Sequence, residues 1–191
     1  STLGKQMVHS LGIPEQRIAL TPFSVDNNWW ISQSNQVDRQ IVRKHWDISD
    51  DATILLFCAK LQPWKCPQDV LRAFAQANIQ NSYLIFAGDG SLKVELENEA
   101  QSLNIKNRVK FLGFVNQSQL PSIYSSSDLF ILPSDYEPFG VVVNEAMLCG
   151  CPVIVSDKVG AGYDLVRHDE NGFIYPCGDI NVLTEILKEV L

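Results

Sequence analysis

Short runs of consecutive apolar residues alternate along the chain with segments whose apolar residues recur every three or four positions. The runs predict strands that are buried on both faces, as in parallel sheets, at residues 52–58, 83–86, 108–112, 128–132, 152–155 and 172–175. Helices are predicted after them, at residues 67–79, 91–103, 118–126, 140–148, 161–167 and 179–191. This alternation predicts an α/β fold, a doubly wound, Rossmann-like parallel sheet of six strands.

The first fifty residues lack this regular alternation. We expect a helix over residues 5–11, a short strand over 17–20 and a helix over 36–46, whereas residues 22–35 show little periodicity and are interpreted as an ordered connection between domains. The predicted domains are therefore residues 1–35, the end of a preceding domain with this connection, and residues 36–191, a Rossmann-like domain. Because the chain starts without Met and stops inside a predicted helix, we expect a fragment of a longer protein.

Composition narrows the class of protein. The 191 residues are 46% hydrophobic and 19% charged, which is typical of a globular domain. A formal net charge of −7 argues against nucleic acid or an anionic membrane as the main partner. No apolar run approaches the roughly 18 residues of a transmembrane helix, so no such segment is predicted.

Cysteine and histidine spacing indicates neither disulfides nor a metal site. The five cysteines form no CxxC pair, and the three histidines lie far apart. Small buried thiols in a reducing cytosol are the favoured interpretation of Cys58, Cys66, Cys149, Cys151 and Cys177. The sequence therefore predicts a cytoplasmic protein that needs no metal.

Topology predicts where a ligand binds. In a strand order of 3-2-1-4-5-6, a crevice opens between the carboxyl ends of the first and fourth strands. Lys60 and Lys65 follow the first strand, and Glu137 follows the fourth. Free backbone N–H groups at the start of the next helix, at residues 140–142, favour an anion. Together these groups suit a diphosphate, while Glu137 and Glu145 can accept hydrogen bonds from sugar hydroxyls.

Each of these residues also has a structural interpretation. A lysine after a strand is often only solvated, Glu137 can favour a helix dipole, and Glu145 can be an exposed helical residue. Their convergence on one crevice favours the ligand site. Neither a GxGxxG fingerprint after the first strand nor a GxxxxGK[ST] loop is present, which argues against an NAD dehydrogenase and a P-loop NTPase.

The segment Glu137-Pro-Phe-Gly-Val-Val-Val-Asn-Glu145 resembles the E-x(7)-E signature of the group 1 retaining glycosyltransferases of GT-B fold. Further blocks agree in order: Val25-Asp26, Phe57-Cys-Ala-Lys-Leu61 with Lys65, Phe86-Ala-Gly-Asp-Gly90, Val109-Lys-Phe-Leu-Gly113, Ala146-Met147, Pro152-Val153-Ile154 and Asn171-Gly172-Phe173. Where the family usually has Gly-Arg, this chain has Ala59-Lys60. The resemblance covers roughly residues 18–191.

The resemblance implies the C-terminal, donor-binding half of a two-domain enzyme of polysaccharide or glycoconjugate biosynthesis. It implies a nucleotide diphosphate sugar as donor, a hexosyl-type transfer with retention, and no cofactor or metal. By resemblance the catalytic residues are Glu137, Lys65 and Lys60, and the donor-binding residues are Phe139, Gly140, Val141, Val142, Glu145, Phe114 and Val115. The acceptor is unknown, an N-terminal half is missing, and the isolated domain is expected to be inactive. The whole protein would be cytoplasmic or peripheral at the inner membrane.

Two other functions stay open at this point. A non-catalytic nucleotide-binding module would bind nucleotide without transferring sugar. A sugar-nucleotide epimerase uses the same fold, although Pro138-Phe139-Gly140 within the E-x(7)-E spacing disfavours it.

Overall fold

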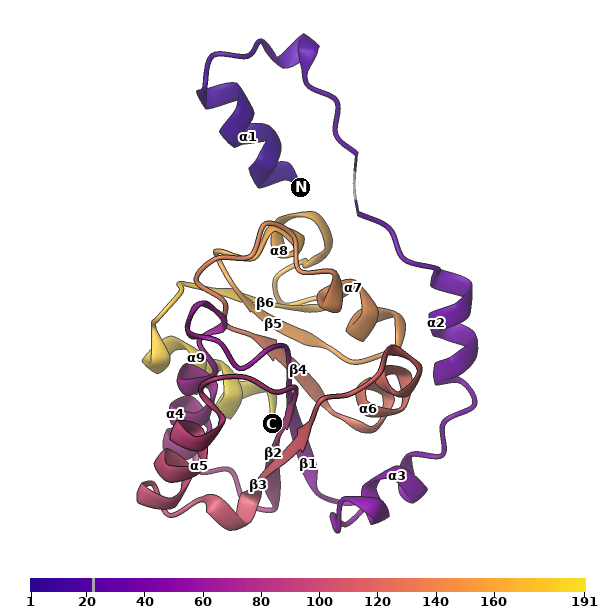
Figure 1. Cartoon of the computed structure of the whole chain (residues 1–191), viewed down its shortest axis with the longest axis vertical. Helices are drawn as coiled ribbons and strands as arrows, with labels where there is room; N and C mark the ends of the chain where they lie inside the picture. Colours follow the sequence, from indigo (N-terminus) through magenta and orange to yellow (C-terminus); the bar gives the residue numbers. More distant parts are fainter. Residues whose placement is uncertain (22) are drawn as a thin grey trace.

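A six-stranded parallel sheet forms the centre of the computed structural model, which describes residues 1–21 and 23–191 (Figure 1). Its strands are β1 (Thr53–Cys58), β2 (Ser82–Ala87), β3 (Val109–Gly113), β4 (Leu129–Leu132), β5 (Val153–Ser156) and β6 (Gly172–Tyr175). Their order is β3-β2-β1-β4-β5-β6, with every neighbouring pair parallel. The predicted fold class and strand order are confirmed, and the order reverses between β1 and β4 as expected.

Helices cover both faces of the sheet (Figure 1). One face carries α4 (Pro67–Ala77), α5 (Lys93–Ser102) and α9 (Ile180–Val190). The other carries α2 (Asn27–Ser34), α3 (Arg39–His45), α6 (Leu120–Ser126), α7 (Val141–Leu148) and α8 (Gly160–Leu165). Helix α1 (Thr2–Ser10) lies beyond α8, and 3-10 turns occupy Glu15–Arg17, Pro63–Lys65, Lys106–Arg108 and Gln117–Gln119.

The apolar runs are continuous because each strand supplies two cores. Along β1, Leu55 and Phe57 pack into the core beneath α4 and α9, whereas Ile54 and Leu56 pack into the core beneath α6 and α7. All four side chains are fully buried. Successive side chains of a strand point to opposite faces, so a strand covered on both sides is mostly apolar at consecutive positions.

The N-terminal region differs from expectation in two places. Residues 27–34 form α2, and Trp30 on this helix is 1% exposed within the main core, so much of the aperiodic segment 22–35 is helical. Arg17 ends a 3-10 turn and residues 18–20 form no strand, since no strand of the sheet lies beside them. Pro22 lies outside the described residues. The domain boundary near residue 35 stays a prediction.

Helix α3 is fixed to the sheet by a buried arginine. The Arg43 guanidinium donates to the carbonyls of Asp50, Ala52 and Ser126 at 2.8, 2.7 and 3.0 Å. It also donates to Asp128 Oδ2 at 2.7 Å, and the same oxygen accepts from the Ile54 amide. This one side chain therefore joins α3, the start of β1 and the start of β4.

Candidate functional site

Two loops meet where the strand order reverses. One follows β1 and the other follows β4, and the Asp135 amide donates to the Trp64 carbonyl at 3.0 Å. Such a bond between loops at the carboxyl ends of β1 and β4 places the predicted residues of both loops at one edge of the sheet. The two loops that topology predicts to flank the ligand therefore meet at the expected edge of the sheet.

An ion pair spans the two loops. Lys65 Nζ donates to Glu137 Oε2, and the two side chains are only 18% and 15% exposed. Partial burial weakens the screening of this pair by water. The structure thus brings together Lys65 and Glu137, two of the three residues predicted as catalytic.

Gly140 forms the amino end of α7 beside this pair. Its φ of +90° is a backbone conformation that residues with a side chain rarely adopt. A Cβ there would lie 3.0 Å from Glu137 Cγ and 3.1 Å from Val159 Cγ1. The first amides of the helix, at Val141 and Val142, have no intrahelical acceptor, and their dipoles favour negative charge. A cation from the loop after β1 and a helix amino end from the loop after β4 therefore lie at the same edge of the sheet.

Backbone hydrogen bonds from the start of α8 hold the loop that contains Glu137 in place. The Gly160 amide donates to the Glu137 carbonyl at 3.0 Å, and the Ala161 amide donates to the Phe139 carbonyl. A Cβ at Gly160 would lie 2.2 Å from the Pro138 carbonyl oxygen, so only glycine permits this approach. Phe139 itself is buried and its ring packs on Phe23 with centroids 5.1 Å apart. The loop is thus preorganised rather than free.

Glu145 points into the core from α7 and is 7% exposed. The Tyr124 hydroxyl on α6 donates to Glu145 Oε2 at 3.3 Å. Burial raises the pKa of the Glu145 carboxyl, and the hydrogen bond from Tyr124 offsets part of that rise. A carboxylate kept in such a place is costly to the fold, which is typical of a group retained for a ligand.

Replacing Glu145 with Gln is expected to raise the free energy of unfolding at neutral pH by about 1 kcal/mol. Because the folded pKa lies above the ordinary value of 4.5, the stability present below that value is lost as pH rises through the folded pKa. Urea denaturation between about pH 4 and pH 8 measures the difference, which should widen in favour of the variant as pH rises. A difference independent of pH would contradict this explanation.

The remaining predicted residues lie further from the ion pair. Lys60 is exposed, and no ion pair among the described residues includes it. Phe114, 77% exposed, and Val115 line a hollow of about 360 Å³ that they share with Trp46 and Ile123. A planar apolar ligand fits such a place, and its use by a nucleotide base stays a prediction.

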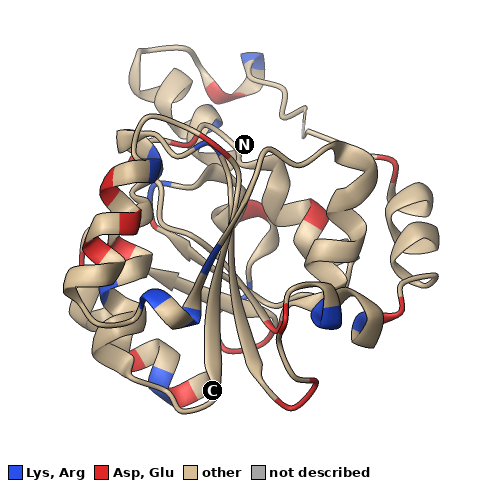
Figure 2. Ribbon diagram, turned by 60° about the horizontal axis from the view of Figure 1, so that its bottom comes forward, with Lys and Arg blue, Asp and Glu red and all other residues tan. Residues whose placement is uncertain are grey.

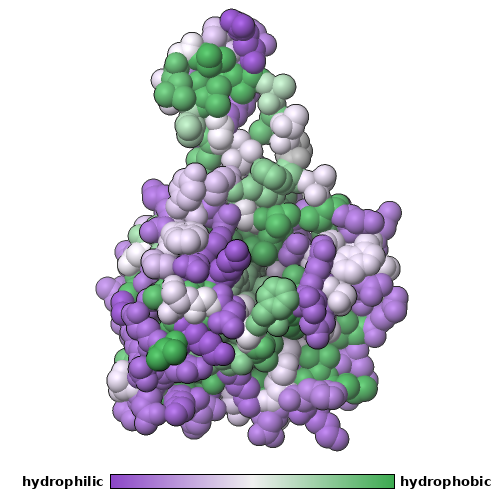
Figure 3. Space-filling model, in the orientation of Figure 1, coloured by the Kyte–Doolittle hydropathy of each residue, from purple (hydrophilic) through white to green (hydrophobic). Residues whose placement is uncertain are grey.

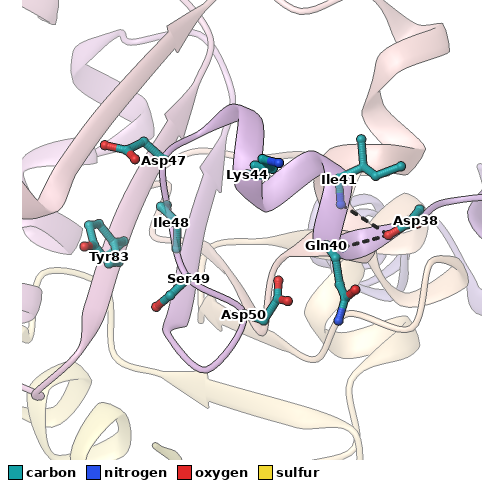
Figure 4. A pocket seen from close by; sticks show the side chains of 9 residues that line it. All are labelled: Asp38, Gln40, Ile41, Lys44, Asp47, Ile48, Ser49, Asp50 and Tyr83. Carbon is teal, nitrogen blue, oxygen red and sulfur yellow. Dashed lines mark hydrogen bonds between the residues drawn. The ribbon is translucent and has the colours of Figure 1, made fainter.

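A second hollow, of about 810 Å³, lies at the opposite end of the strands, where β1 and β2 begin (Figure 4). It is lined by Asp38, Gln40, Ile41, Lys44, Asp47, Ile48, Ser49, Asp50 and Tyr83. Asp38 is already used, because its carboxylate caps α3 by accepting from the amides of Gln40 and Ile41. Three carboxylates against one lysine do not suit a phosphate, so this hollow is not favoured as the predicted phosphate site.

Charge elsewhere on the molecule is mainly negative. Figure 2 shows acidic residues over several helices and loops, and α5 alone carries Glu95, Glu97 and Glu99. Against this background, Lys65 next to the amino end of α7 is a local source of positive charge. Within the described part of the chain, no three His, Cys, Asp or Glu side chains form a group that could hold a metal ion. That the activity needs no metal stays a prediction.

Sequence reasoning missed Tyr124, Trp64 and Phe23. Tyr124 lies in a short, serine-rich segment with no motif of its own, and only the packing of α6 on α7 reveals its contact with Glu145. Trp64 contributes a backbone carbonyl, which no residue type signals. Phe23 lies in the connecting segment before α2, far from Phe139 in sequence.

Solved structures show the same architecture. The chain resembles HepE of Anabaena in complex with UDP and glucose, with a TM-score of 0.84 and 28% identity over 99% of this chain and 51% of HepE. It also resembles the apo form of WaaB, a lipopolysaccharide outer core galactosyltransferase, with a TM-score of 0.78 and 22% identity over 97% of this chain and 50% of WaaB. The six-stranded parallel fold therefore matches that of GT-B glycosyltransferases.

Curated relatives agree with the structures. An uncharacterised glycosyltransferase of Methanocaldococcus jannaschii is 32% identical over 92% of this chain and 45% of its own length. The N-acetyl-α-D-glucosaminyl L-malate synthase of Bacillus anthracis is 33% identical over 74% of this chain and 37% of its own length. The chain thus spans less than half the length of these relatives. The family model for glycosyl transferases group 1 matches residues 38–191. This chain belongs to the group 1 glycosyltransferases.

Proposed function

We propose that this chain is the donor-binding half of a retaining, hexosyl-type glycosyltransferase and that it binds a nucleotide diphosphate sugar. The ion pair of Lys65 and Glu137 beside the amino end of α7 carries the proposal. A cation and unpaired helix amides suit the diphosphate, and a carboxylate next to them suits the sugar that the diphosphate releases. The UDP bound to the related HepE supports this choice of ligand.

Each group has one role in the proposed reaction. As the bond between sugar and diphosphate breaks, negative charge grows on the departing phosphate, and Lys65, Lys60 and the amides of Phe139 to Val142 stabilise it without a metal ion. Glu137 positions the sugar and stabilises positive charge at its reacting carbon. Glu145 accepts hydrogen bonds from the ribose, and the base packs beside Phe114 and Val115.

Retention is supported by the spacing of Glu137 and Glu145 and by the products of relatives. Their names include an N-acetyl-α-D-glucosaminyl synthase and an α-1,3-galactosyltransferase that uses UDP-Gal. An α-linked product formed from an α-linked donor keeps the configuration of the sugar. These relatives also support a role in polysaccharide or glycoconjugate synthesis.

The acceptor would bind mainly to a second, N-terminal half. HepE carries nearly as much further chain as the part that matches here. Apolar side chains gather on α1 and the segment after it, at the top of Figure 3. In the N-terminal region up to the start of α2, Met7, Leu11, Leu20 and Phe23 are between 47% and 72% exposed. We propose that the second half covers these residues, and that this chain alone binds donor but transfers no sugar.

None of the helices in residues 1–21 and 23–191 has the length and apolar character to cross a membrane. We propose a cytoplasmic enzyme, peripheral at the inner membrane if its acceptor is a lipid. A non-catalytic module or an epimerase is not favoured, because the matched family consists of glycosyltransferases. Detection of an epimerised sugar nucleotide would restore the second alternative.

Nucleotide diphosphates are expected to stabilise the chain against heat. At a concentration about 100 times its dissociation constant, UDP, GDP or ADP should add about 2.7 kcal/mol, or roughly 5–10 °C in melting temperature for a domain of this size. Differential scanning calorimetry of the wild type and of Lys65→Met measures this shift, which the variant should largely lose. Lys188→Met, which removes an exposed lysine of α9, is the matched control. No shift with any of the three nucleotides would contradict the proposed function.

A further inference from the structure

The Tyr124 ring is held in place by packing, and its hydroxyl lies beside Glu145 and the Cys58 thiol. The side chain is fully buried, and its ring packs edge-on against Phe130 with centroids 5.8 Å apart and against Trp30 at 6.0 Å. Aromatic neighbours on two sides prevent the ring from changing rotamer without opening the core. The phenol is therefore a rigid donor aimed at α7.

The hydrogen bond from Tyr124 makes the two carboxylate oxygens of Glu145 different from each other. Oε2 accepts from Tyr124, whereas Oε1 accepts from none of the described residues. Among the described residues, the side-chain atoms that are sealed from solvent and lack a hydrogen-bond partner are Ser125 Oγ, Ser126 Oγ, Ser134 Oγ and Tyr175 Oη. Glu145 Oε1 is not one of these atoms, so it is accessible to solvent. A carboxylate that is anchored through one oxygen and accessible through the other is oriented for a ligand.

We propose that Tyr124 is a positioning residue that fixes Glu145 so that Oε1 faces the ribose hydroxyls, and that it thereby sets the preference for ribonucleotides over 2′-deoxyribonucleotides. The proposal rests on the proposed role of Glu145 in binding the ribose. When a buried polar group of a binding site forms a hydrogen bond with a ligand hydroxyl, an analogue without that hydroxyl binds more weakly, because it leaves the buried group without a partner. Such discrimination requires that the Glu145 carboxylate keeps its orientation, and the hydrogen bond from Tyr124 holds it there.

Tyr124→Phe removes the hydroxyl and keeps the ring that packs on Trp30 and Phe130. Titration calorimetry of the 191-residue chain with UDP and 2′-deoxy-UDP gives the affinity ratio of the two nucleotides. We expect the wild type to favour UDP about tenfold and the variant to lose about threefold or more of that preference. Affinity for 2′-deoxy-UDP should change less than affinity for UDP, because 2′-deoxy-UDP lacks the 2′-hydroxyl and keeps only the 3′-hydroxyl for Glu145 to contact.

Tyr175→Phe is the matched control. Tyr175 is 1% exposed, and its hydroxyl is sealed without a partner among the described residues, so this variant should keep the wild-type ratio. Glu145→Asp retracts the carboxylate from Tyr124 without removing its charge and should lower the ratio as Tyr124→Phe does, which provides a second test if Tyr124→Phe fails to fold.

The outcomes separate the inference from the function on which it rests. If Tyr124→Phe weakens both nucleotides equally, or Glu145→Asp keeps the full ratio, Tyr124 does not position a ribose ligand and the inference is wrong. If the wild type binds UDP without preferring it to 2′-deoxy-UDP, the ribose role of Glu145 fails while donor binding stands. If the chain binds none of UDP, GDP and ADP, the proposed function fails and the inference fails with it.

Discussion

Replacing Glu137 with Gln is expected to lower the turnover of an enzyme that carries both halves by about a hundredfold or more, because the variant lacks a charge placed where the sugar carbon becomes positive. The same change frees Lys65 from its ion pair. Nucleotide affinity should therefore stay unchanged or become tighter, since the lysine can then give its whole charge to the diphosphate. Steady-state kinetics and UDP titration measure the two effects separately.

Asp135→Asn is the control for this experiment. Asp135 lies two residues away in the same loop, is exposed, and forms no ion pair among the described residues. Its loss changes the net charge by the same amount and should change turnover less than about threefold. Unchanged turnover in Glu137→Gln would remove Glu137 from catalysis. A parallel loss of affinity and turnover would make it a binding group only.

Replacing Arg43 with Met is expected to lower the free energy of unfolding by about 3–5 kcal/mol. The variant leaves the Asp128 carboxylate without its buried partner and removes the donor from the carbonyls of Asp50, Ala52 and Ser126. Met fills a similar space, so the loss reports the polar contacts rather than a cavity. Urea denaturation at neutral pH measures it.

Arg39→Met tests whether the burial of the Arg43 guanidinium accounts for its contribution to stability. Arg39 pairs with the same Asp128 carboxylate, but its side chain is 43% exposed, whereas that of Arg43 is 1% exposed. Exposed pairs contribute little because water screens them, so this variant should lose less than about 1 kcal/mol. Equal losses for the two arginines would show that Arg43 is not the anchor of α3.

Most of the fold could be predicted because its signals are local and repeated. Each strand of the sheet is an apolar run, and the strand order follows from connection rules that do not depend on details. Helix α2 could not be found this way. Trp30 is its one buried residue, so there is no periodic face for a pattern to reveal. The segment 17–20 has strand-like residues but no neighbouring strand with which to pair.

The site was partly predictable for the same reason. Topology alone brings Lys65 and Glu137 to one crevice, and their ion pair agrees with that expectation. The burial of Glu145 depends on how α6 packs against α7, which sequence spacing does not encode. Lys60 follows β1 and Phe114 follows β3, as predicted. Their predicted roles depend on contacts with the donor, whereas the sheet and its helices depend only on contacts within the chain.

The ion pair also bears on which anions the crevice admits. Because Glu137 already neutralises Lys65, an entering anion must displace a tethered carboxylate whose local concentration is far above that of any dissolved phosphate. A free monophosphate gains one contact and loses one, so it is expected to compete poorly. A diphosphate that also reaches the amides of α7 gains contacts that the carboxylate does not replace. We therefore expect the ion pair to disfavour free phosphate at this position relative to the proposed nucleotide diphosphate donor.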